Sequence, residues 1–314
     1  MSQARDGIHI HTCPLCEAMC GLEITVKDGR VAKIRANKDD VWSKGYICPK
    51  GTALGELHHD PDRLRAPLIR DGDTFREVTW DEAFAEVERR LRAVIDAHGM
   101  DAVTVYIGNP TAHNFSLSRY VAAFAPMSGI PRLYSAGTVD QWPKNVSSAL
   151  LFGGMWTFPL PDLDRTDYLI VMGANPHASQ GSLLAAPDLL ARLDAIRARG
   201  GVVVVLDPRR TASCDIADLH LPLKAGSDVM LFNGLLAYLH EHGIVDTPFV
   251  AAHTEGMHQA VGVAEKTSGS LAHVARACGV SGEKLSEFYQ LFARSERVIT
   301  AFSQGVNQSS SGTD

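Results

Sequence analysis

The sequence lacks the features that mark export, membrane insertion or nucleic-acid binding. Its 314 residues carry a net charge of −6 and contain no polybasic run, so neither nucleic acid nor a membrane surface is indicated as a partner. No apolar stretch approaches the roughly 20 residues of a membrane helix. The first seven residues hold neither a hydrophobic core nor twin arginines, so no export signal is visible. We expect no membrane insertion.

Two common nucleotide-binding patterns are also absent. No G-x-G-x-x-G follows the first predicted apolar strand, and no G-x4-G-K-[ST] occurs anywhere in the chain. These patterns bring backbone N–H groups close to phosphates in dinucleotide-binding and P-loop folds. The sequence therefore does not indicate a typical NAD-binding or P-loop protein.

Cysteine is scarce, but four of the six cysteines form one pattern. Cys13, Cys16 and Cys20 give C-x2-C-x3-C, and Cys48 follows after twenty-seven intervening residues. Four thiolates can bind zinc, copper(I) or an iron–sulfur cluster. Structural zinc usually takes paired C-x2-C ligands, whereas three close ligands and one distant ligand suit a [4Fe-4S] cluster. A zinc site and disulfides remain the alternatives.

The cysteine content also bears on the compartment. Thiols in a metal-type pattern are typical of a reducing environment, so we expect a cytoplasmic protein. Cys214 and Cys278 stand alone, and we interpret them as small buried apolar residues.

The N-terminal part predicts a small antiparallel sheet and then a long helix. Residues 22–26 and 31–35 alternate around an Asp-Gly turn, which is typical of a β-hairpin. Residues 56–78 are interpreted as an irregular connector. Thr79 and Glu82 have capping-box spacing at the start of a helix through about His98. The arginine run on this helix is interpreted as a solvated face.

The rest of the chain alternates between apolar strands and helices. A hydrophobic content of 45% with 21% charged residues, over 314 residues, is that of a globular protein of two or so domains. Strands buried on both faces and separated by helices predict a parallel sheet in an α/β domain. We expect strands at 102–107, 168–172, 202–206 and 298–302, and helices at 114–125, 183–199, 228–242 and 282–294.

Three of these strands end in residues suited to ligand binding. The ends are Gly108-Asn109-Pro110, Gly173-Ala174-Asn175-Pro176 and Asp207-Pro208-Arg209. In open α/β sheets, ligands bind outside the carboxyl ends of the strands. Asparagine can donate and accept hydrogen bonds, and arginine can bind a phosphate with two N–H groups. The ends together predict a cradle for a nucleotide-bearing cofactor, although each is also a common turn sequence.

In combination, these motifs resemble the molybdopterin oxidoreductases of the dimethyl sulfoxide reductase family, which includes formate dehydrogenases and nitrate reductases. The resemblance covers the cysteine pattern with Cys48-Pro49-Lys50-Gly51, the strand ends at 173–176 and 207–209, and Pro222–Asp228. It implies a [4Fe-4S] cluster and a molybdenum or tungsten atom held by two molybdopterin guanine dinucleotides.

The resemblance also assigns expected roles to residues. Lys50 would lie between cluster and pterin and assist electron transfer; the alternative is a surface lysine. The remaining residues would line the dinucleotide site: Gly108, Asn109, Gly173, Asn175, Pro176, Asp207, Pro208, Arg209, Gly226, Asp228, Gln304, Gly305 and Asn307.

The protein ligand to the metal is expected at Asp140. In relatives a Cys, selenocysteine, Ser or Asp lies shortly before a proline and a helix, and Asp140 lies three residues before Pro143. A carboxylate is a hard oxygen ligand that suits high-valent molybdenum. The alternative is an aspartate that caps the following helix. Formate dehydrogenases of the family have Cys or selenocysteine followed by His, whereas Gln141 follows here.

We thus expect an α/β protein with a small antiparallel iron–sulfur domain at 1–60, a first α/β segment at 61–140, and a dinucleotide-binding-like domain at 141–314. Largely parallel sheets would form α/β sandwiches, and the chain would stop before the family's C-terminal cofactor-binding barrel. The expected function is two-electron redox of a small oxyanion or formate, with electrons passed to or from a redox partner protein or electron-transfer subunit. The alternatives are a non-catalytic electron-transfer or scaffold subunit and a zinc-stapled α/β binding module.

Overall fold

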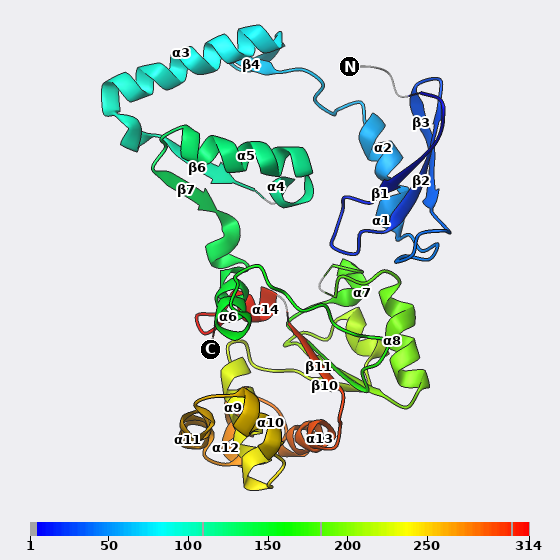
Figure 1. Ribbon diagram of the computed structural model, residues 1–314, viewed down its shortest axis with the longest axis vertical. Helices are drawn as coiled ribbons and strands as arrows, with labels where there is room; N and C mark the ends of the chain where they lie inside the picture. The colour runs from blue at the N-terminus through cyan, green and yellow to red at the C-terminus, as the bar shows by residue number, and fades with distance from the viewer. Residues whose placement is uncertain (1–4, 109, 183, 303, 314) are drawn as a thin grey trace. The chain divides into compact units, whose positions relative to one another are not determined.

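The computed structural model describes residues 5–108, 110–182, 184–302 and 304–313. The chain forms two compact units, residues 1–136 and 137–314 (Figure 1). The finer division expected at residue 60 stays a prediction. No helix in the described parts of the chain is both long and apolar enough to cross a membrane.

The first unit begins with the expected antiparallel sheet, which has one strand more than the predicted hairpin. Its strands are β1 (Gly7–Thr12), β2 (Gly21–Lys27) and β3 (Arg30–Ala36), in the order β1-β2-β3. β1 and β2 pair from Gly7 opposite Val26 to Thr12 opposite Gly21. The chain between Thr12 and Gly21 carries three of the four patterned cysteines, so this sheet supports the cysteine loop.

The expected irregular connector at 56–78 is wrong, because this stretch contains a helix end and a hairpin. Two short helices, α1 (Pro49–Thr52) and α2 (Leu54–His59), precede strands β4 (Leu68–Asp71) and β5 (Thr74–Glu77). The strands pair around the turn at Gly72, whose φ of +60° lies in the left-handed region. Their side chains are mostly exposed, which explains why no alternating apolar pattern showed them.

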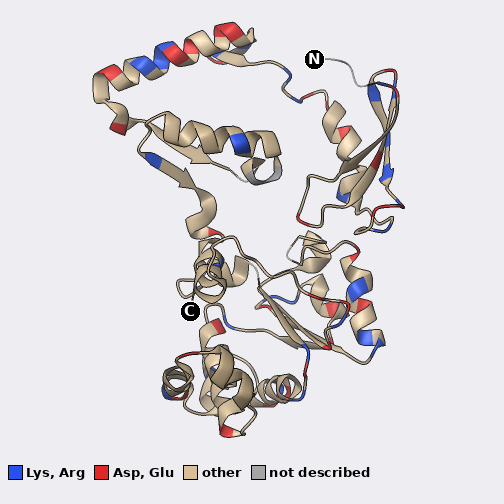
Figure 2. Cartoon of the chain, viewed as in Figure 1, with Lys and Arg blue, Asp and Glu red and all other residues tan. Residues whose placement is uncertain are grey.

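The long helix α3 (Trp80–His98) forms as predicted. The Thr79 hydroxyl accepts a hydrogen bond from the Glu82 N–H at 3.2 Å, and the helix ends at Gly99. Arg89 and Arg90 pair with Glu86 at 2.7 and 2.6 Å on a solvated face, which confirms the interpretation of the arginine run. Figure 2 shows the charged residues along this helix.

The remainder of the first unit is a small parallel α/β element. Strands β6 (Thr104–Ile107) and β7 (Arg132–Ser135) form a two-stranded parallel sheet. Helices α4 (Pro110–His113) and α5 (Phe115–Met127) connect them, and the Asn114 side chain caps α5 by accepting from the Leu117 N–H. None of the residues of known exposure between 79 and 136 is buried.

The second unit contains a four-stranded parallel sheet in the order β10-β9-β8-β11. The strands are β8 (Tyr168–Met172), β9 (Val202–Leu206), β10 (Leu219–Leu221) and β11 (Val298–Phe302). β8 is central and fully buried, with Tyr168 opposite Val202 and Val298 on its two neighbours. The three longer strands were predicted, and the parallel sheet is confirmed.

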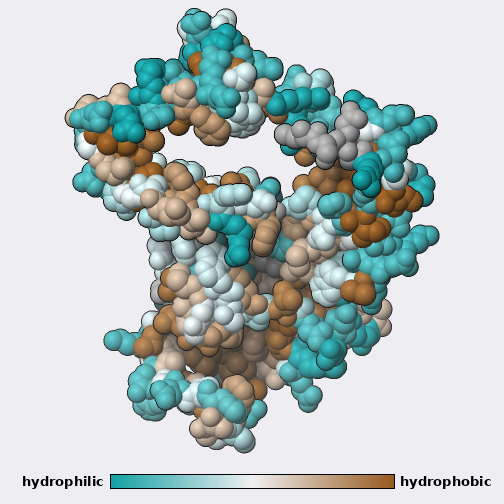
Figure 3. All heavy atoms as spheres, turned by 45° about the horizontal axis from the view of Figure 1, so that its top comes forward, coloured by the Kyte–Doolittle hydropathy of each residue, from teal (hydrophilic) through white to brown (hydrophobic). Residues whose placement is uncertain are grey.

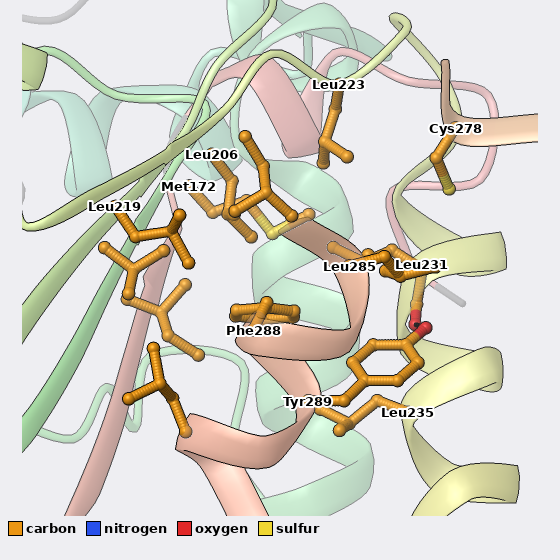
Figure 4. Close-up of a cluster of buried hydrophobic side chains, with 14 of the residues drawn as sticks. Met172, Leu206, Leu219, Leu223, Leu231, Leu235, Cys278, Leu285, Phe288 and Tyr289 are labelled. Carbon is orange, nitrogen blue, oxygen red and sulfur yellow. Dashed lines mark hydrogen bonds between the residues drawn. The ribbon is translucent and has the colours of Figure 1, made fainter. Parts of the chain in front are cut away.

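Helices cover both faces of this sheet, as its continuous apolar strands require. On one face α8 (Leu189–Ala198) packs on Leu169 and Val171. On the other, α9 (Asp228–Glu241), α12 (Leu271–Cys278) and α13 (Gly282–Ala293) pack on Tyr168 and Ile170. Figure 4 shows this second core, where the Tyr289 hydroxyl points at α9. The helix predicted at 183–199 begins at Leu189, beyond Pro187; Leu183 lies outside the described residues.

Several elements had not been predicted. Besides α1, α2, α4, β4 and β5, they include the helices α10 (Thr247–His253) and α11 (Met257–Ser268) with α12, the short α7 (Pro176–Ser179) and α14 (Gln304–Asn307), the strands β1, β7 and β10, and three 3₁₀ turns, η1 (Met100–Ala102), η2 (Ala136–Val139) and η3 (Ala212–Ile216). Helix α6 (Trp142–Phe152) is the helix expected after Pro143. Its Leu150 and Leu151 are 77% and 74% exposed, and Figure 3 shows further hydrophobic residues at the surface.

Candidate functional site

The four patterned cysteines gather at one end of the N-terminal sheet. Cys13, Cys16 and Cys20 lie in the loop between β1 and β2, and the Cys13 N–H donates to the Cys20 carbonyl at 2.8 Å. Met19 adopts a left-handed φ of +49° within the turn. Cys48 immediately precedes α1 as its N-cap residue. The loop therefore closes on itself, and the fourth cysteine comes from a separate segment, as the spacing predicted.

These thiols are close enough to influence one another. Cys13 and Cys20 are buried with Ala18 and Leu22, and Cys16 packs against them. Burial raises the pKa of the Cys20 thiol to about 11, and the neighbouring thiols add to the effect. Burial likewise raises the pKa of the Cys13 thiol. Because thiolates are the ligand form, binding a positively charged centre here would release protons.

Among the residues described, no group of three or more His, Cys, Asp or Glu side chains is placed to hold one metal ion. Structural zinc needs its sulfurs about 2.3 Å from one centre. A four-iron cluster binds each thiolate at a different iron and so spreads them apart. No disulfide forms, since all six cysteines are free thiols.

Lys50 lies beside this cysteine group. It is exposed in the single turn of α1, and its charge acts on Cys13 to favour the thiolate and lower that thiol's pKa. Gly51 follows, and a Cβ there would lie 2.7 Å from Ile47 and 4.0 Å from the Cys13 sulfur. A side chain at Gly51 would therefore crowd the cysteine loop. The role of Lys50 between cluster and pterin stays a prediction.

In the second unit, two predicted glycines meet where strands β8 and β11 end. The Gly305 N–H donates to the Gly173 carbonyl at 3.1 Å. A Cβ on Gly173 would lie 2.8 Å from the Gly305 Cα, and a Cβ on Gly305 would lie 2.6 Å from the Gly173 Cα. Gly173 also has a φ of +56°. The two loops can approach this closely only because both positions are glycine.

Asn175 and Pro176 follow Gly173 at the same edge. Asn175 is the N-cap residue of α7, but its side chain makes no capping bond. Its Oδ1 instead accepts from the Ser213 hydroxyl at 2.7 Å, and the Ser213 oxygen accepts from the His177 N–H at 3.0 Å. Ser213, which the sequence reasoning missed, is 1% exposed and holds the Asn175 amide in one orientation. No motif marked it.

Asp207, Pro208 and Arg209 form a turn after β9. The Asp207 Oδ1 accepts from the Arg209 N–H at 2.8 Å, and the Asp207 carbonyl meets the His220 ring at 2.9 Å. Asp207 is half-buried, whereas Pro208 and Arg209 are exposed. One oxygen of the Asp207 carboxylate thus stabilises the turn, which is the alternative to ligand binding that the sequence allowed. The Arg209 side chain is accessible to an anion.

Gly226 and Asp228 line a cavity of about 850 Å³ together with residues of α6 and β11. Lys144 and Phe302 are among its walls, and the Lys144 ammonium lies 4.9 Å from the Phe302 ring centre. Burial raises the pKa of the Asp228 carboxyl. This cavity does not include Gly173, Asn175, Asp207 or Arg209 among its lining residues.

Asp140 is joined to the loop after β11. The Gln304 Nε2 donates a hydrogen bond to the Asp140 Oδ1 across 164 residues of sequence. The Asn307 Nδ2 lies 3.4 Å from the Gln304 Oε1. The capping alternative for Asp140 is not observed, because Gln141 is the N-cap residue of α6 and no side chain caps it. Three predicted residues therefore form one hydrogen-bonded group.

Two buried amide oxygens in this region have no partner among the described residues. They are Oδ1 of Asn307, which is 3% exposed, and Oδ1 of Asn145, which is fully buried on α6. Asn145 was not predicted, because an asparagine inside a helix carries no motif. Unpaired buried acceptors are costly, and a donor from a ligand or water would satisfy them.

The strand end at Gly108 lies in the first unit. Gly108 is exposed, and its carbonyl accepts from the Thr111 N–H at 3.2 Å. Asn109 lies outside the described residues. Since the two units are separate bodies, the roles of Gly108 and Asn109 stay predictions.

The fold and the cysteine group define a class: a small cysteine-loop domain followed by a parallel α/β domain with ligand-type loops at its strand ends. Comparison with known families agrees. Residues 11–60 match the molybdopterin oxidoreductase Fe4S4 domain, and residues 63–314 match molybdopterin oxidoreductase. The chain belongs to the molybdopterin oxidoreductase family.

Individual relatives are consistent with this assignment. The chain is 32% identical to a nitrate reductase of Shewanella frigidimarina, over 96% of this chain and 32% of that protein. It is 27% identical to the F420-dependent formate dehydrogenase subunit alpha of Methanocaldococcus jannaschii, over 96% of this chain and 43% of that one. The fold is similar to that of acetylene hydratase from Pelobacter acetylenicus, with a TM-score of 0.78 and 20% identity over 95% of this chain and 40% of that chain. The chain thus spans less than half of these relatives.

The family's cofactors are a [4Fe-4S] cluster and a molybdopterin with molybdenum or tungsten. The residues present fit these groups. Four thiols gather in the Fe4S4-domain region. In the second unit, Gly173 and Gly305 have no side chains that would cover the backbone of their loops. The Oδ1 of Asn307 is a buried hydrogen-bond acceptor without a partner among the described residues.

Proposed function

We propose that this chain is the cluster-binding and cofactor-binding part of an oxidoreductase with a molybdenum or tungsten bis-molybdopterin guanine dinucleotide. The observation that carries the proposal is the group of four thiols from two segments, with Lys50 beside it. The metal cofactor would supply the two-electron chemistry, and the cluster would pass electrons one at a time to or from a redox partner.

Within the first unit, the proposal assigns the cluster to Cys13, Cys16, Cys20 and Cys48. Cys13 and Cys20 are buried and would keep part of the cluster from solvent. Burial and hydrogen bonds from backbone N–H groups to the sulfurs are among the factors that set the reduction potential of an iron–sulfur cluster. Lys50 would assist electron transfer, since its charge already acts on Cys13.

Within the second unit, the residues around the strand ends would hold the dinucleotide. Gly173 and Gly305 allow close backbone approach, and Asn175 and Asn307 offer amide groups held by neighbours. Arg209 is exposed and suited to bind a phosphate. Asp228 and Gly226 line the cavity and would contact the guanosine. Pro176, Asp207 and Pro208 shape the turns between them.

Asp140 would be the protein ligand to the metal. Its position before Pro143 matches the ligand position that the resemblance implies, and its carboxylate is engaged by Gln304 rather than by a helix terminus. A carboxylate is a hard oxygen donor, which suits a high-valent metal.

The substrate class is proposed as a small oxyanion or formate. Relatives named as nitrate reductases and formate dehydrogenases support it. The partner would be a redox protein or electron-transfer subunit. Six free thiols fit a reducing compartment, so the cytoplasm is the proposed location.

Metal and nucleotide analysis tests this function. The anaerobically purified protein should contain iron and acid-labile sulfide, and molybdenum or tungsten with releasable guanine nucleotide. A protein with the cluster but with neither pterin nor guanine nucleotide would instead be a non-catalytic electron-transfer subunit. Zinc as the only metal would contradict both.

A further inference from the structure

Gln304 occupies an unusual position between two polar side chains of different kinds. Its Nε2 donates to the Asp140 carboxylate, and its Oε1 faces the Asn307 Nδ2 at 3.4 Å. The amide group of a glutamine side chain can donate a hydrogen bond through its nitrogen and accept one through its oxygen. The three residues therefore form a directional series from Asn307 through Gln304 to Asp140.

Asn307 is the anchored end of this series. It is 3% exposed, and it lies one helical turn after Gln304 in α14. The Gln308 N–H closes that turn by donating to the Gln304 carbonyl at 2.9 Å. Because Asn307 presents its N–H group to Gln304, a flipped Gln304 amide would face N–H against N–H there and oxygen against oxygen at Asp140. The observed orientation of the Gln304 amide therefore matches both Asn307 and Asp140.

Asp140 is also held from its backbone side. The Asp140 N–H donates to the Gly137 carbonyl at 3.1 Å. Gly137 is buried against the Trp142 ring, which leaves no room for a Cβ. The Gln304 bond occupies Oδ1, and no described residue pairs with Oδ2. A carboxylate fixed in this way presents one oxygen as a ligand.

We propose that Gln304 and Asn307 are positioning residues for the Asp140 carboxylate: Asn307 sets the orientation of the Gln304 amide, and Gln304 fixes one carboxylate oxygen so that the other can bind the metal. This proposal rests on the proposed role of Asp140 as a metal ligand. Gln304 would then position the Asp140 carboxylate in addition to contacting the cofactor, which is the role expected for its loop.

A double-mutant cycle on the 314-residue chain tests the contact without any cofactor. The variants are Asp140→Ala, Gln304→Met and the double substitution, compared by urea unfolding. We expect Gln304→Met to lower the unfolding midpoint in the parent chain and to have a smaller effect in the Asp140→Ala background, where only its contact with Asn307 remains to be lost. Equal effects in both backgrounds would overturn the proposal.

X-ray absorption at the molybdenum or tungsten edge tests the role in protein purified with its metal. Asp140→Ala should remove one oxygen scatterer. Gln304→Glu, which places a carboxylate against Asp140, should weaken or remove the same scatterer, and so should Asn307→Asp, which opposes the Gln304 oxygen. The matched control Gln308→Glu makes the same charge change at an exposed residue of the same segment and should leave the spectrum unchanged.

The outcomes separate the two claims. If Asp140→Ala leaves the spectrum unchanged, Asp140 is not a ligand, and the positioning proposal falls with that assignment even where the cycle shows coupling. If Asp140→Ala removes the oxygen while Gln304→Glu does not, the ligand assignment stands and the positioning proposal is overturned. Iron and sulfide content bears on the proposed cluster independently of both.

Discussion

The backbones of Gly173 and Gly305 are in direct contact at the carboxyl edge of the second unit's sheet. The Gly305 N–H donates to the Gly173 carbonyl at 3.1 Å, and neither position has room for a Cβ. This contact joins the loop after β8 to the loop after β11. It therefore sets the place of Asn175 on one side and of Gln304 on the other.

Gly173→Ala should separate these loops. The left-handed φ alone costs about 1–2 kcal/mol for a residue with a Cβ, and crowding against Gly305 adds about 1–3 kcal/mol. Gly243→Ala is the matched control, because Gly243 has a φ of +67° and nothing within 4 Å of a new Cβ. Denaturant unfolding should show a larger loss of stability for Gly173→Ala than for Gly243→Ala, and equal losses would contradict the crowding.

Tyr289→Phe should destabilise the second unit. The buried Tyr289 hydroxyl donates to the Leu231 carbonyl at 2.6 Å (Figure 4). Its loss leaves a buried carbonyl without this partner and should cost about 1–2 kcal/mol in the free energy of unfolding. Tyr120→Phe, at a residue that is 77% exposed, should have almost no effect. A thermal melt of both variants checks this, and similar melting temperatures would refute it.

Asp228 should make stability depend on pH. Burial raises the pKa of the folded carboxyl above the ordinary value of 3.8. The folded state then binds the proton more tightly than the unfolded state, so stability falls as pH rises from about the ordinary value through the raised one. Asp228→Asn should therefore stabilise the cofactor-free chain at pH 7 and give no gain at pH 3.

The comparison for Asp228→Asn is the exposed Asp194→Asn. The measurement is the unfolding midpoint of both variants and of the parent chain at pH 7 and at pH 3. A gain from Asp228→Asn that persists unchanged at pH 3, or no gain at pH 7, would contradict the burial of this carboxyl.

Asp140→Ala in the complete holoenzyme should abolish turnover while the optical and EPR spectra of the cluster stay unchanged. The reason is that Asp140 would bind the metal of the second unit, whereas the cluster cysteines lie in the first. Unchanged turnover would remove Asp140 from the active site.

Local signals in the sequence predicted local structure well. Thr79 was marked by its spacing to Glu82 and caps its helix as observed. The helix expected from about Asn114 begins directly after that residue, which caps it. The continuous apolar runs of β8 and β9 predicted buried parallel strands. The strands β4 and β5 were missed because they are short and solvated, so no periodic apolar pattern accompanies their turn.

Tertiary contacts between polar residues could not be predicted. Nothing near Asp140 indicated a partner 164 residues away, because that pairing depends on how α6 and α14 pack. Ser213 was missed for the same reason. Asp207 illustrates the opposite case: the sequence allowed both a turn and a ligand role, and the structure shows that one carboxylate oxygen is used by the turn.

The assignment of the four cysteines to one cluster is tested most directly by iron and acid-labile sulfide analysis of anaerobically purified protein. We expect about four of each per chain, as a [4Fe-4S] cluster requires. Cys48→Ser should lose most of both, whereas Cys278→Ser, at a buried cysteine of α12, should retain them. A parent protein that holds zinc and no iron or sulfide would contradict the account.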